Sequence, residues 1–415
     1  MPIVITSKGK DFTAWRAAGD FGKMFHEELR RRTANLSSAQ SEALYLGVEQ
    51  ELERRAADHD NSLVRMKQMI AEAKAGDDPV LLRALTEEYY TVSYEFFRWN
   101  RSATAFFQLG KEFLRAISES VVALAKVRLG VIEGRLPPLA LIAVGPAGHH
   151  EFSPFCRLQL LLIHAEPDPA AARPVELLGW ILHEIFEEIG LRPDEVVTPR
   201  TPDWRGSSVQ WRQRIVTGLE RGTSAELIEI FRLADQSVLH DEENVGAEFR
   251  SACLRLLTDS KVAMHNLVTR LQSLSGGLGM MGGIRMERSG PCRGLFGLLD
   301  HALLPLSAGI TALSFMHGLD VFETPKRIRG LLYRGFLNVE MAERLLEAWH
   351  LFNELRLAQE VVKHPHWDSW DGLCVDTTGM SDDQLDELRL CLETVVTLQR
   401  HVGITFSGWQ DQVIC

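Results

Sequence analysis

Much of the chain alternates apolar and polar residues at a spacing of three to four positions. This spacing predicts helices over most of 11–129, where no proline interrupts the pattern before Pro79. Asp77-Asp78-Pro79 is a break, and proline in a first turn predicts a new helix over Val80–Asn100. A further helix is expected over Ser102–Leu129. The two helices are rich in aromatic residues, whose helical spacing favours a bundle core over a ligand surface.

The pattern changes after Gly130–Pro138, which is rich in Gly and Pro. Two short apolar runs follow, Leu139–Val144 and Leu158–His164, joined by a Gly-Pro-Ala-Gly turn and a polar passage. Short apolar runs bounded by Gly and Pro are typical of buried strands, although periodicity alone does not distinguish them from helix. If they pair as neighbouring strands, the turn Gly145–Glu151 lies beside the start of the second strand.

The rest of the chain is predicted to be mainly helical. The expected helices are Pro174–Gly190, Trp204–Glu220, Val245–Leu274, Leu295–His317, Pro325–His364 and Ser381–His401. Ser381 and Gln384 fit a capping box at the start of the last helix. His183–Glu187 reads HEIFE and lacks the second histidine of a zinc-protease helix, so a solvated face is expected there. Glycine-rich Ser275–Arg293 is interpreted as a flexible connector, with a phosphate or substrate loop as the alternative.

These elements predict a mainly α protein with a small α/β domain. We expect an N-terminal helical domain over 1–130, an α/β domain with a mixed sheet over 131–260, and a C-terminal helical domain over 261–415. A chain of 415 residues is too long for one ordinary core, which agrees with several domains.

Composition narrows the class of protein. The chain is 45% apolar and 24% charged, as in soluble globular proteins, and its net charge of −11 argues against a broad nucleic-acid surface. No apolar run approaches the roughly 20 residues that span a bilayer, and the first ten residues have no signal-peptide pattern. The six cysteines form no CxxC pair and are expected to be reduced thiols. We therefore expect a cytoplasmic protein without membrane or nucleic-acid partners.

The turn Gly145–Glu151 and the strand after it are the candidate chemical site. A polymerase-β-type nucleotidyltransferase holds its triphosphate on a Gly-Ser turn and binds Mg²⁺ through Asp-x-Asp on the next strand. Two Asp side chains at i and i+2 of a strand share one face and can bind the same metal site, and a third carboxylate comes from a later strand.

Gly145–Ile163 resembles this motif as it occurs in nucleotidyltransferases related to the PII-protein uridylyltransferase. In that family a helical regulatory region precedes Gly-Ser-x-Gly-Arg-x-Glu and Asp-x-Asp, and a helical substrate-binding domain follows. The resemblance covers roughly Ser118 to Val362. Other segments similar to the family follow in the same order: Trp204–Gln213, Leu233–Asp241, Leu303–Pro305, Glu323–Ile328 and Leu355–Gln359.

The resemblance implies that Gly145, Gly148 and Glu151 match the turn, whereas Pro146 and His149 replace its Ser and Arg. The two metal-binding Asp positions fall on Arg157 and Gln159. Arginine cannot bind Mg²⁺, and glutamine offers one neutral oxygen. The third carboxylate corresponds to Asp235, which is the only one of the three that survives and the candidate catalytic residue.

A different site could have replaced the metal site. Arg157 could hold a phosphate directly, with Gly145, Gly148, His149, Glu151 and Gln159 around the nucleotide, or it could be a surface residue in an ion pair. The histidines at 149, 150 and 164 could bind a transition metal with Glu151 or Cys156, although adjacent histidines in a turn are more often just exposed.

The leading interpretation is a degenerate, inactive nucleotidyltransferase-like protein with a regulatory or scaffolding role through protein partners and no cofactor. One alternative is an active transferase that uses an NTP and Mg²⁺ to modify a protein or small molecule. Its carboxylates would then be Asp235, Asp241, Glu242 and Glu243. Another alternative is a metal-independent nucleotide sensor. The apolar helices also leave room for a homodimer.

Overall fold

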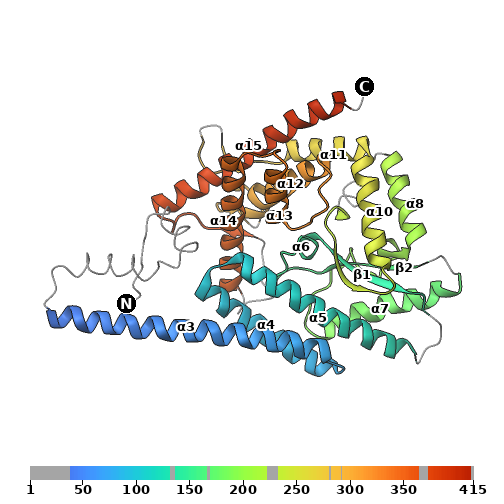
Figure 1. Ribbon diagram of the computed structural model, residues 1–415, viewed down its shortest axis with the longest axis horizontal. Helices are drawn as coiled ribbons and strands as arrows, with labels where there is room; N and C mark the ends of the chain where they lie inside the picture. The colour runs from blue at the N-terminus through green and yellow to red at the C-terminus, as the bar shows by residue number, and fades with distance from the viewer. Residues whose placement is uncertain are drawn as a thin grey trace.

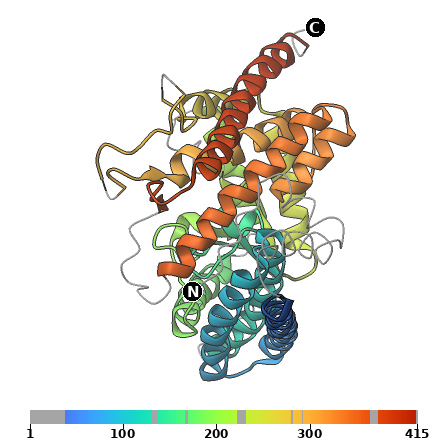
Figure 2. The same cartoon turned by 90° about the vertical axis from the view of Figure 1, so that its left-hand side faces the viewer.

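The computed structural model describes residues 38–130, 136–165, 169–221, 232–279, 282–290, 292–363 and 373–412. Helices dominate it, and a small mixed sheet lies among them, which confirms a mainly α protein with a small α/β part (Figure 1). The turned view shows the first helices at one end, the C-terminal helices at the other and the sheet region between them (Figure 2).

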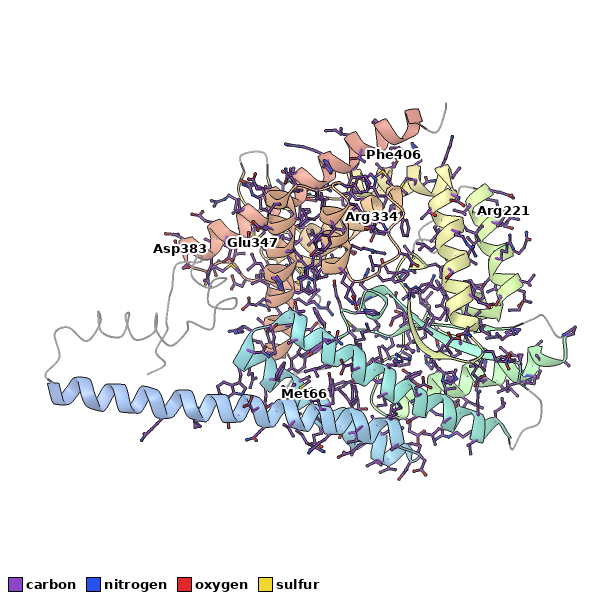
Figure 3. All side chains as sticks on the ribbon, viewed as in Figure 1. Met66, Arg221, Arg334, Glu347, Asp383 and Phe406 are labelled. Carbon is purple, nitrogen blue, oxygen red and sulfur yellow. A yellow bond between two sulfur atoms is a disulfide. The ribbon has the colours of Figure 1, made fainter. Side chains whose placement is uncertain are left out.

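The first three described helices are α3 (Ser38–Ala75), α4 (Pro79–Asn100) and α5 (Ala103–Gly130). The predicted start of the second helix is confirmed, because the Asp78 side chain accepts a hydrogen bond from the Val80 N–H and proline occupies the first turn. Met66 of α3 is fully buried within these helices (Figure 3).

The aromatic residues of α4 and α5 are packed as predicted, with one exception. The exposed fraction of Trp99 is 37%. The other side chains are buried in the core: Tyr89, Tyr90, Tyr94, Phe96, Phe97, Phe106 and Phe107.

The central sheet has the strand order β3-β2-β1-β4. β1 (Leu139–Val144) and β2 (Gln159–His164) confirm the two predicted strands and pair antiparallel, with Val144 opposite Gln159. β4 (Ser237–Asp241) pairs antiparallel with the other edge of β1. All six residues of β1 are buried, because one face packs toward α5 and the other toward α10.

A short strand occupies part of a predicted helix. The helix expected over Trp204–Glu220 begins only with α8 (Ser208–Arg221), after β3 (Arg205–Ser207), which pairs parallel with β2. The cause is a capping box, in which the Ser207 N–H donates to Gln210 Oε1 and the Gln210 N–H donates to Ser207 Oγ.

The helix expected over Pro174–Gly190 is α7 (Ala172–Glu188), which follows the short helix η1 (Pro169–Ala171). The expectation of a solvated face is wrong for His183, which is only 2% exposed. Its ring nitrogens lie 2.9 Å from Thr198 Oγ1 and 3.2 Å from Arg200 Nη1. A loop that includes the short helix η2 (Pro202–Trp204) therefore covers this histidine.

Two long predicted helices are each divided in the structure. Ser260 separates α10 (Val245–Asp259) from α11 (Lys261–Ser273), and its hydroxyl accepts a hydrogen bond from the Ala263 N–H as the new N-cap. α13 (Thr324–Tyr333) ends before Gly335, whose φ of +77° reverses the chain ahead of α14 (Val339–Lys363).

The C-terminal region also contains the π-helical turn η3 (Leu299–Leu303), α12 (Leu304–Met316) and α15 (Asp382–Gln412). The predicted capping box of the last helix is confirmed by reciprocal hydrogen bonds between Ser381 and Gln384.

One segment of this region is long and apolar enough to cross a membrane, contrary to the expectation that no run approaches that length. Among the described residues it is Leu299–Met316, and 67% of it is buried inside the protein. Such burial is typical of a core helix in a soluble protein.

The glycine-rich segment after α11 is held by backbone hydrogen bonds, such as those from the N–H groups of Arg285 to Gly277 O and Glu287 to Leu295 O. It leads into β5 (Phe296–Gly297), which pairs with β6 (Cys374–Val375). This pairing brings together two cysteines 82 residues apart, and Cys292 forms a disulfide with Cys374 at a Cα–Cα distance of 5.2 Å. The expectation of six reduced thiols is thus wrong for this pair.

The hydrophobic side chains form two large clusters on opposite faces of the sheet. The first cluster joins α3, α4, α5 and α7 to the sheet face on which Leu141 lies. The second joins α8 and the C-terminal helices to the opposite face, on which Ile142 lies. Both clusters therefore extend across the boundary expected at 130/131, and the second also extends across 260/261, while the three-domain division stays a prediction.

Loss of the disulfide should reduce stability. Because it closes a long loop, we expect reduction or Cys292→Ser to lower the free energy of unfolding by about 2–4 kcal/mol. Urea unfolding with and without a thiol reductant measures this difference. The reductant should have no effect on Cys292→Ser, and the same midpoint for oxidised and reduced wild type would contradict the prediction.

Candidate functional site

The candidate site lies at the edge of the sheet where β1 ends and β2 and β4 begin. The chain leaves β1 through α6 (Gly145–Gly148) and reaches Glu151, so the predicted turn contains one helical turn. Figure 1 shows α6 between the sheet and the C-terminal helices. We call residues Gly145–Glu151 the loop.

Both matched glycines are in close contact with other parts of the site. A Cβ at Gly148 would lie 2.3 Å from the backbone oxygen of Asp235, so only glycine fits there. Gly145 has a φ of +62°, and a Cβ at this position would lie 2.5 Å from Gln159 Oε1. The loop is thus packed directly against the start of β2 and against Asp235, two residues before β4.

Asp235 is buried between two cationic groups. Its Oδ2 lies 3.0 Å from His149 Nδ1, and its Oδ1 lies 2.5 Å from Arg327 Nη1. His149 Nδ1 and Asp235 Oδ1 have no partner with hydrogen-bond geometry, so we regard both contacts as mainly Coulombic. Burial alone would raise the pKa of Asp235, but the charges of Arg327 and His149 hold that pKa well below its usual range.

The same pairing raises the pKa of His149. Burial opposes the imidazolium form, but the carboxylate of Asp235, with a smaller contribution from Glu151, outweighs this effect.

Arg327 is held in place by neutral oxygens as well. Its side chain is 1% exposed and donates to Val321 O at 2.6 Å, to Thr311 Oγ1 at 2.7 Å and to Ala234 O at 3.3 Å. The guanidinium from α13 is therefore fixed beside the residue that precedes Asp235.

His150 attaches the loop to the start of α13. Its φ is +63°, and its Nδ1 lies 2.7 Å from Glu323 Oε1 while its Nε2 lies 3.1 Å from Ser237 Oγ. Glu323 also pairs with Lys111, at 3.0 Å, and with Lys326. Burial lowers the pKa of His150 despite this carboxylate. Burial would raise the pKa of Glu323, but the hydrogen bonds from its three partners lower it.

Glu151 forms the third attachment. Its Oε1 accepts hydrogen bonds from Thr324 Oγ1 at 3.0 Å and from Trp349 Nε1 at 2.7 Å. Its backbone oxygen accepts a bond of 3.1 Å from Arg356 Nη2. The carboxylate is therefore occupied by α13 and α14.

Arg356 extends this network into the core. Its Nε lies 3.0 Å from Glu360 Oε1, and its Nη2 donates to Ser153 Oγ at 3.0 Å and lies 2.7 Å from Cys156 Sγ. Tyr94 on α4 and Ser153 both donate to the Glu360 carboxylate. This buried ion pair is thus satisfied by hydrogen bonds from the N-terminal and central parts of the chain.

The two residues at the former Asp-x-Asp positions have different surroundings. Gln159 Oε1 accepts a hydrogen bond of 3.1 Å from Arg232. The side chain of Arg157 is 51% exposed, and its Nη1 lies 3.7 Å from Glu195 Oε1. The structure therefore brings Gly145, Gly148, His149, Glu151, Gln159 and Asp235 together and places Arg157 in a surface ion pair.

The geometry provides few ligands for a metal ion. In the pairing of β1 with β2, His164 lies opposite Leu139, at the end of β1 far from the loop. The histidines at 149, 150 and 164 therefore do not converge on one point. Within the described part of the chain, no three His, Cys, Asp or Glu side chains are grouped to hold a metal. The acidic groups of the site instead pair with Arg, Lys, His or Trp side chains of the protein itself.

Sequence reasoning found only part of this site. Thr324, Arg327 and Arg356 belong to segments similar to the family, but nothing in their spacing showed that they reach the loop. Lys111, Trp349 and Glu360 gave no signal, since each contacts residues more than 190 positions away.

Removal of Arg327 should be strongly destabilising. We expect Arg327→Met to cost about 3–5 kcal/mol of unfolding free energy, because it leaves a buried carboxylate without its main partner. Arg327→Met/Asp235→Asn should recover part of this loss. Urea unfolding followed by circular dichroism measures both. Arg157→Met is the exposed control and should change stability by less than about 0.5 kcal/mol; equal effects at the two arginines would contradict this assignment.

The His149–Asp235 pair should make stability depend on pH. The folded-state pKa of His149 is raised, so its contribution is fully present below the unfolded pKa of about 6.5 and is lost as pH rises through the folded pKa. We expect the difference in unfolding free energy between wild type and His149→Gln to decrease from pH 6 to pH 9. A difference that stays constant over this range would show that the imidazolium does not contribute.

Comparison with known proteins agrees with the C-terminal part of the resemblance. Residues 261–406 match the model of a family described as "Putative nucleotidyltransferase substrate binding domain", and this stretch contains α11 to α14 and most of α15. No curated protein matches the chain. The residues that this region supplies to the loop all lie in the matched stretch, which is similar to the substrate-binding part of nucleotidyltransferases: Glu323, Thr324, Arg327, Trp349 and Arg356.

Proposed function

We propose that this chain is a nucleotidyltransferase-like protein that has lost the transfer reaction and acts as a regulatory or scaffolding protein. The observation that carries the proposal is the pairing of Asp235 with Arg327 and His149. A two-metal transferase needs carboxylate oxygens that are open to Mg²⁺. Here Asp235, the one carboxylate that the resemblance retains from the family's three, has a cationic group beside each of its oxygens.

The neighbouring positions support the same conclusion. Gln159 and Arg157 stand where the resemblance expects two metal-binding Asp residues, and Arg157 pairs with Glu195 at the surface. Glu151 is bonded to α13 and α14. We infer that the site needs neither Mg²⁺ nor an NTP, and that its polar groups now join the sheet to the C-terminal helices.

Two finer parts of the proposal follow from the resemblance: a relation to the PII-protein uridylyltransferase and a polymerase-β-like sheet. The cytoplasmic location follows from the composition of the chain, and the protein partners follow from the extent of its helical regions. In a reducing compartment the Cys292–Cys374 disulfide would form only transiently, so peptide mapping of protein isolated under thiol-blocking conditions also tests the location.

A thermal-shift screen against ATP, UTP, CTP and GTP, each with and without Mg²⁺, tests the loss of function. Ligands that bind the folded state raise its midpoint by mass action, so millimolar nucleotide reveals weak sites. We expect no Mg²⁺-dependent shift and no release of pyrophosphate. A Mg²⁺-dependent shift or the release of pyrophosphate would overturn the proposal and support an active transferase.

A shift that does not need Mg²⁺ would instead indicate a nucleotide sensor. In that case Arg157→Ala should abolish the shift, because Arg157 is the exposed guanidinium at the former metal position. Arg173→Ala is the matched control, since this arginine is also exposed and pairs with Glu176 away from the site.

A further inference from the structure

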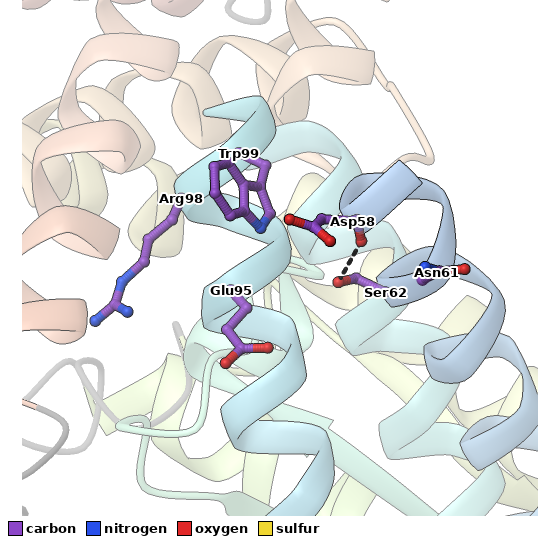
Figure 4. Close-up of a pocket in the computed structure, with 6 residues that line it drawn as sticks. All are labelled: Asp58, Asn61, Ser62, Glu95, Arg98 and Trp99. Carbon is purple, nitrogen blue, oxygen red and sulfur yellow. Dashed lines mark hydrogen bonds between the residues drawn. The ribbon is translucent and has the colours of Figure 1, made fainter. Parts of the chain in front are cut away.

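A surface hollow of about 410 Å³ between α3 and α4 presents charged and aromatic groups, but the chain itself already contacts them (Figure 4). Glu95 and Arg98 both line the hollow, so it carries opposite charges. Asp58 pairs with Arg54 at 2.8 Å, and the same guanidinium lies 5.8 Å from the centre of the Trp99 ring. The hollow therefore supports no ligand site.

The Cys292–Cys374 disulfide joins two surface segments of the C-terminal region. One is the glycine-rich segment, whose described residues 282–290 and 292–295 we call the arm. The other begins with β6, and β6 pairs with β5 over only two residues of each strand. Both cysteines are partly exposed, so a small reagent can reach the sulfur atoms in the folded protein.

The arm has few other attachments. Every described residue of the arm is exposed or half-buried, whereas Phe296 and Leu298 directly after it are fully buried. Its contact with the segment after β6 includes a hydrogen bond of 3.9 Å from Thr377 Oγ1 to Met286 Sδ. Segments with few buried apolar contacts open locally at a low cost in free energy. The disulfide is therefore the main constraint that keeps the arm closed.

The charge of the arm favours one direction of thiol chemistry. Three exposed arginines belong to it: Arg285, Arg288 and Arg293. Its one carboxylate, Glu287, has its Oε1 2.6 Å from His301 Nε2. Cationic neighbours stabilise a thiolate and attract an anionic reagent. Asp376 lies two residues from Cys374, so Cys292 is the better leaving group of the two sulfurs.

The other described thiols are poor competitors for the same reagent. Burial raises the pKa of Cys253 and the pKa of Cys391 to about 12, so both thiols stay protonated at neutral pH. Cys156 is half-buried beside Arg356, and peptide mapping distinguishes it from the pair.

We propose that Cys292–Cys374 is a site of thiol exchange with an anionic low-molecular-weight thiol of the glutathione class, and that its reduction releases the arm. The thiolate of the reagent attacks Cys374 Sγ, the bond between the two cysteine sulfurs breaks, and its electron pair leaves on Cys292 Sγ as a thiolate. A second molecule of reagent attacks the mixed disulfide and leaves Cys374 as a thiolate. The two electrons thus come from two thiols, which end as one disulfide of the reagent.

This inference goes beyond the proposed function and does not depend on the loss of the transfer reaction. The test incubates the oxidised full chain, without denaturant, in buffers of graded ratios of reduced to oxidised glutathione. Acid quenching, alkylation and peptide mapping then measure the pair. We expect reduction in the folded protein and recovery of the disulfide in oxidised glutathione. A disulfide that is reduced only in denaturant would be purely structural and would overturn the proposal.

Arg288→Gln/Arg293→Gln tests the charge of the reagent. Glutathione carries a net negative charge and cysteamine a positive one, so the ratio of their reduction rates should fall about three- to tenfold in this variant. Arg83→Gln is the control, because Arg83 is exposed on α4 and pairs with Glu87 outside the arm. The same ratio in wild type and in both variants would overturn the assignment of an anionic thiol.

Hydrogen exchange measured by mass spectrometry locates the release. The N–H groups of Arg285 and Glu287 donate to backbone oxygens, so peptides that contain them should exchange about tenfold faster or more after reduction. Cys374→Ser should show this fast exchange without a reductant. Ser289→Ala, an exposed change within the arm, should need the reductant as wild type does.

The extent of the change separates local release from general loss of structure. Phe296 and Leu298 are buried, so the opening should end there, and peptides of α5 should not change in the first minutes of exchange. No change in the arm after reduction, or equally faster exchange in α5, would overturn the proposal.

Discussion

The buried pairing of Asp235 with Arg327 connects the two halves of the molecule. Asp235 precedes an edge strand of the sheet, whereas Arg327 belongs to a helix that starts almost ninety residues later. Neither charge could remain in this low-dielectric position without the other, since an isolated buried ion is far too costly. The sheet and α13 must therefore assemble together, and His149 adds the loop to the same assembly.

The backbone geometry of the site depends on this assembly. Gly148 is in contact with the backbone of Asp235, so the loop reaches its position only when Asp235 is in place. The left-handed conformation of His150 carries a cost for a residue with a side chain, and its contacts with Glu323 and Ser237 offset it. In this chain the loop is thus stabilised by side chains of the protein, in the place where the resemblance would put a nucleotide.

The sequence predicted the local elements well and the long-range contacts poorly. β1 and α4 were found almost to the residue, because apolar runs, Pro79 and the Asp78 cap are local signals. The breaks at Ser260 and Gly335 were missed because the apolar pattern continues across them. The disulfide, the burial of His183 and the partners of Asp235 depend on which segments meet after folding, and spacing along one sequence carries no information about that.

Three consecutive residues of the loop are bound at three different points of the C-terminal helices. His149 is linked through Asp235 to Arg327, His150 contacts Glu323, and Glu151 contacts Trp349 on α14. A segment held in this way cannot shift while the helices stay still, nor can the helices tilt without moving the segment. Any molecule that changes the angle of α14 would therefore also move the loop at the end of β1. A molecule that moves the loop would change the angle of α14 in turn, and the coupling free energy would be the same for both effects.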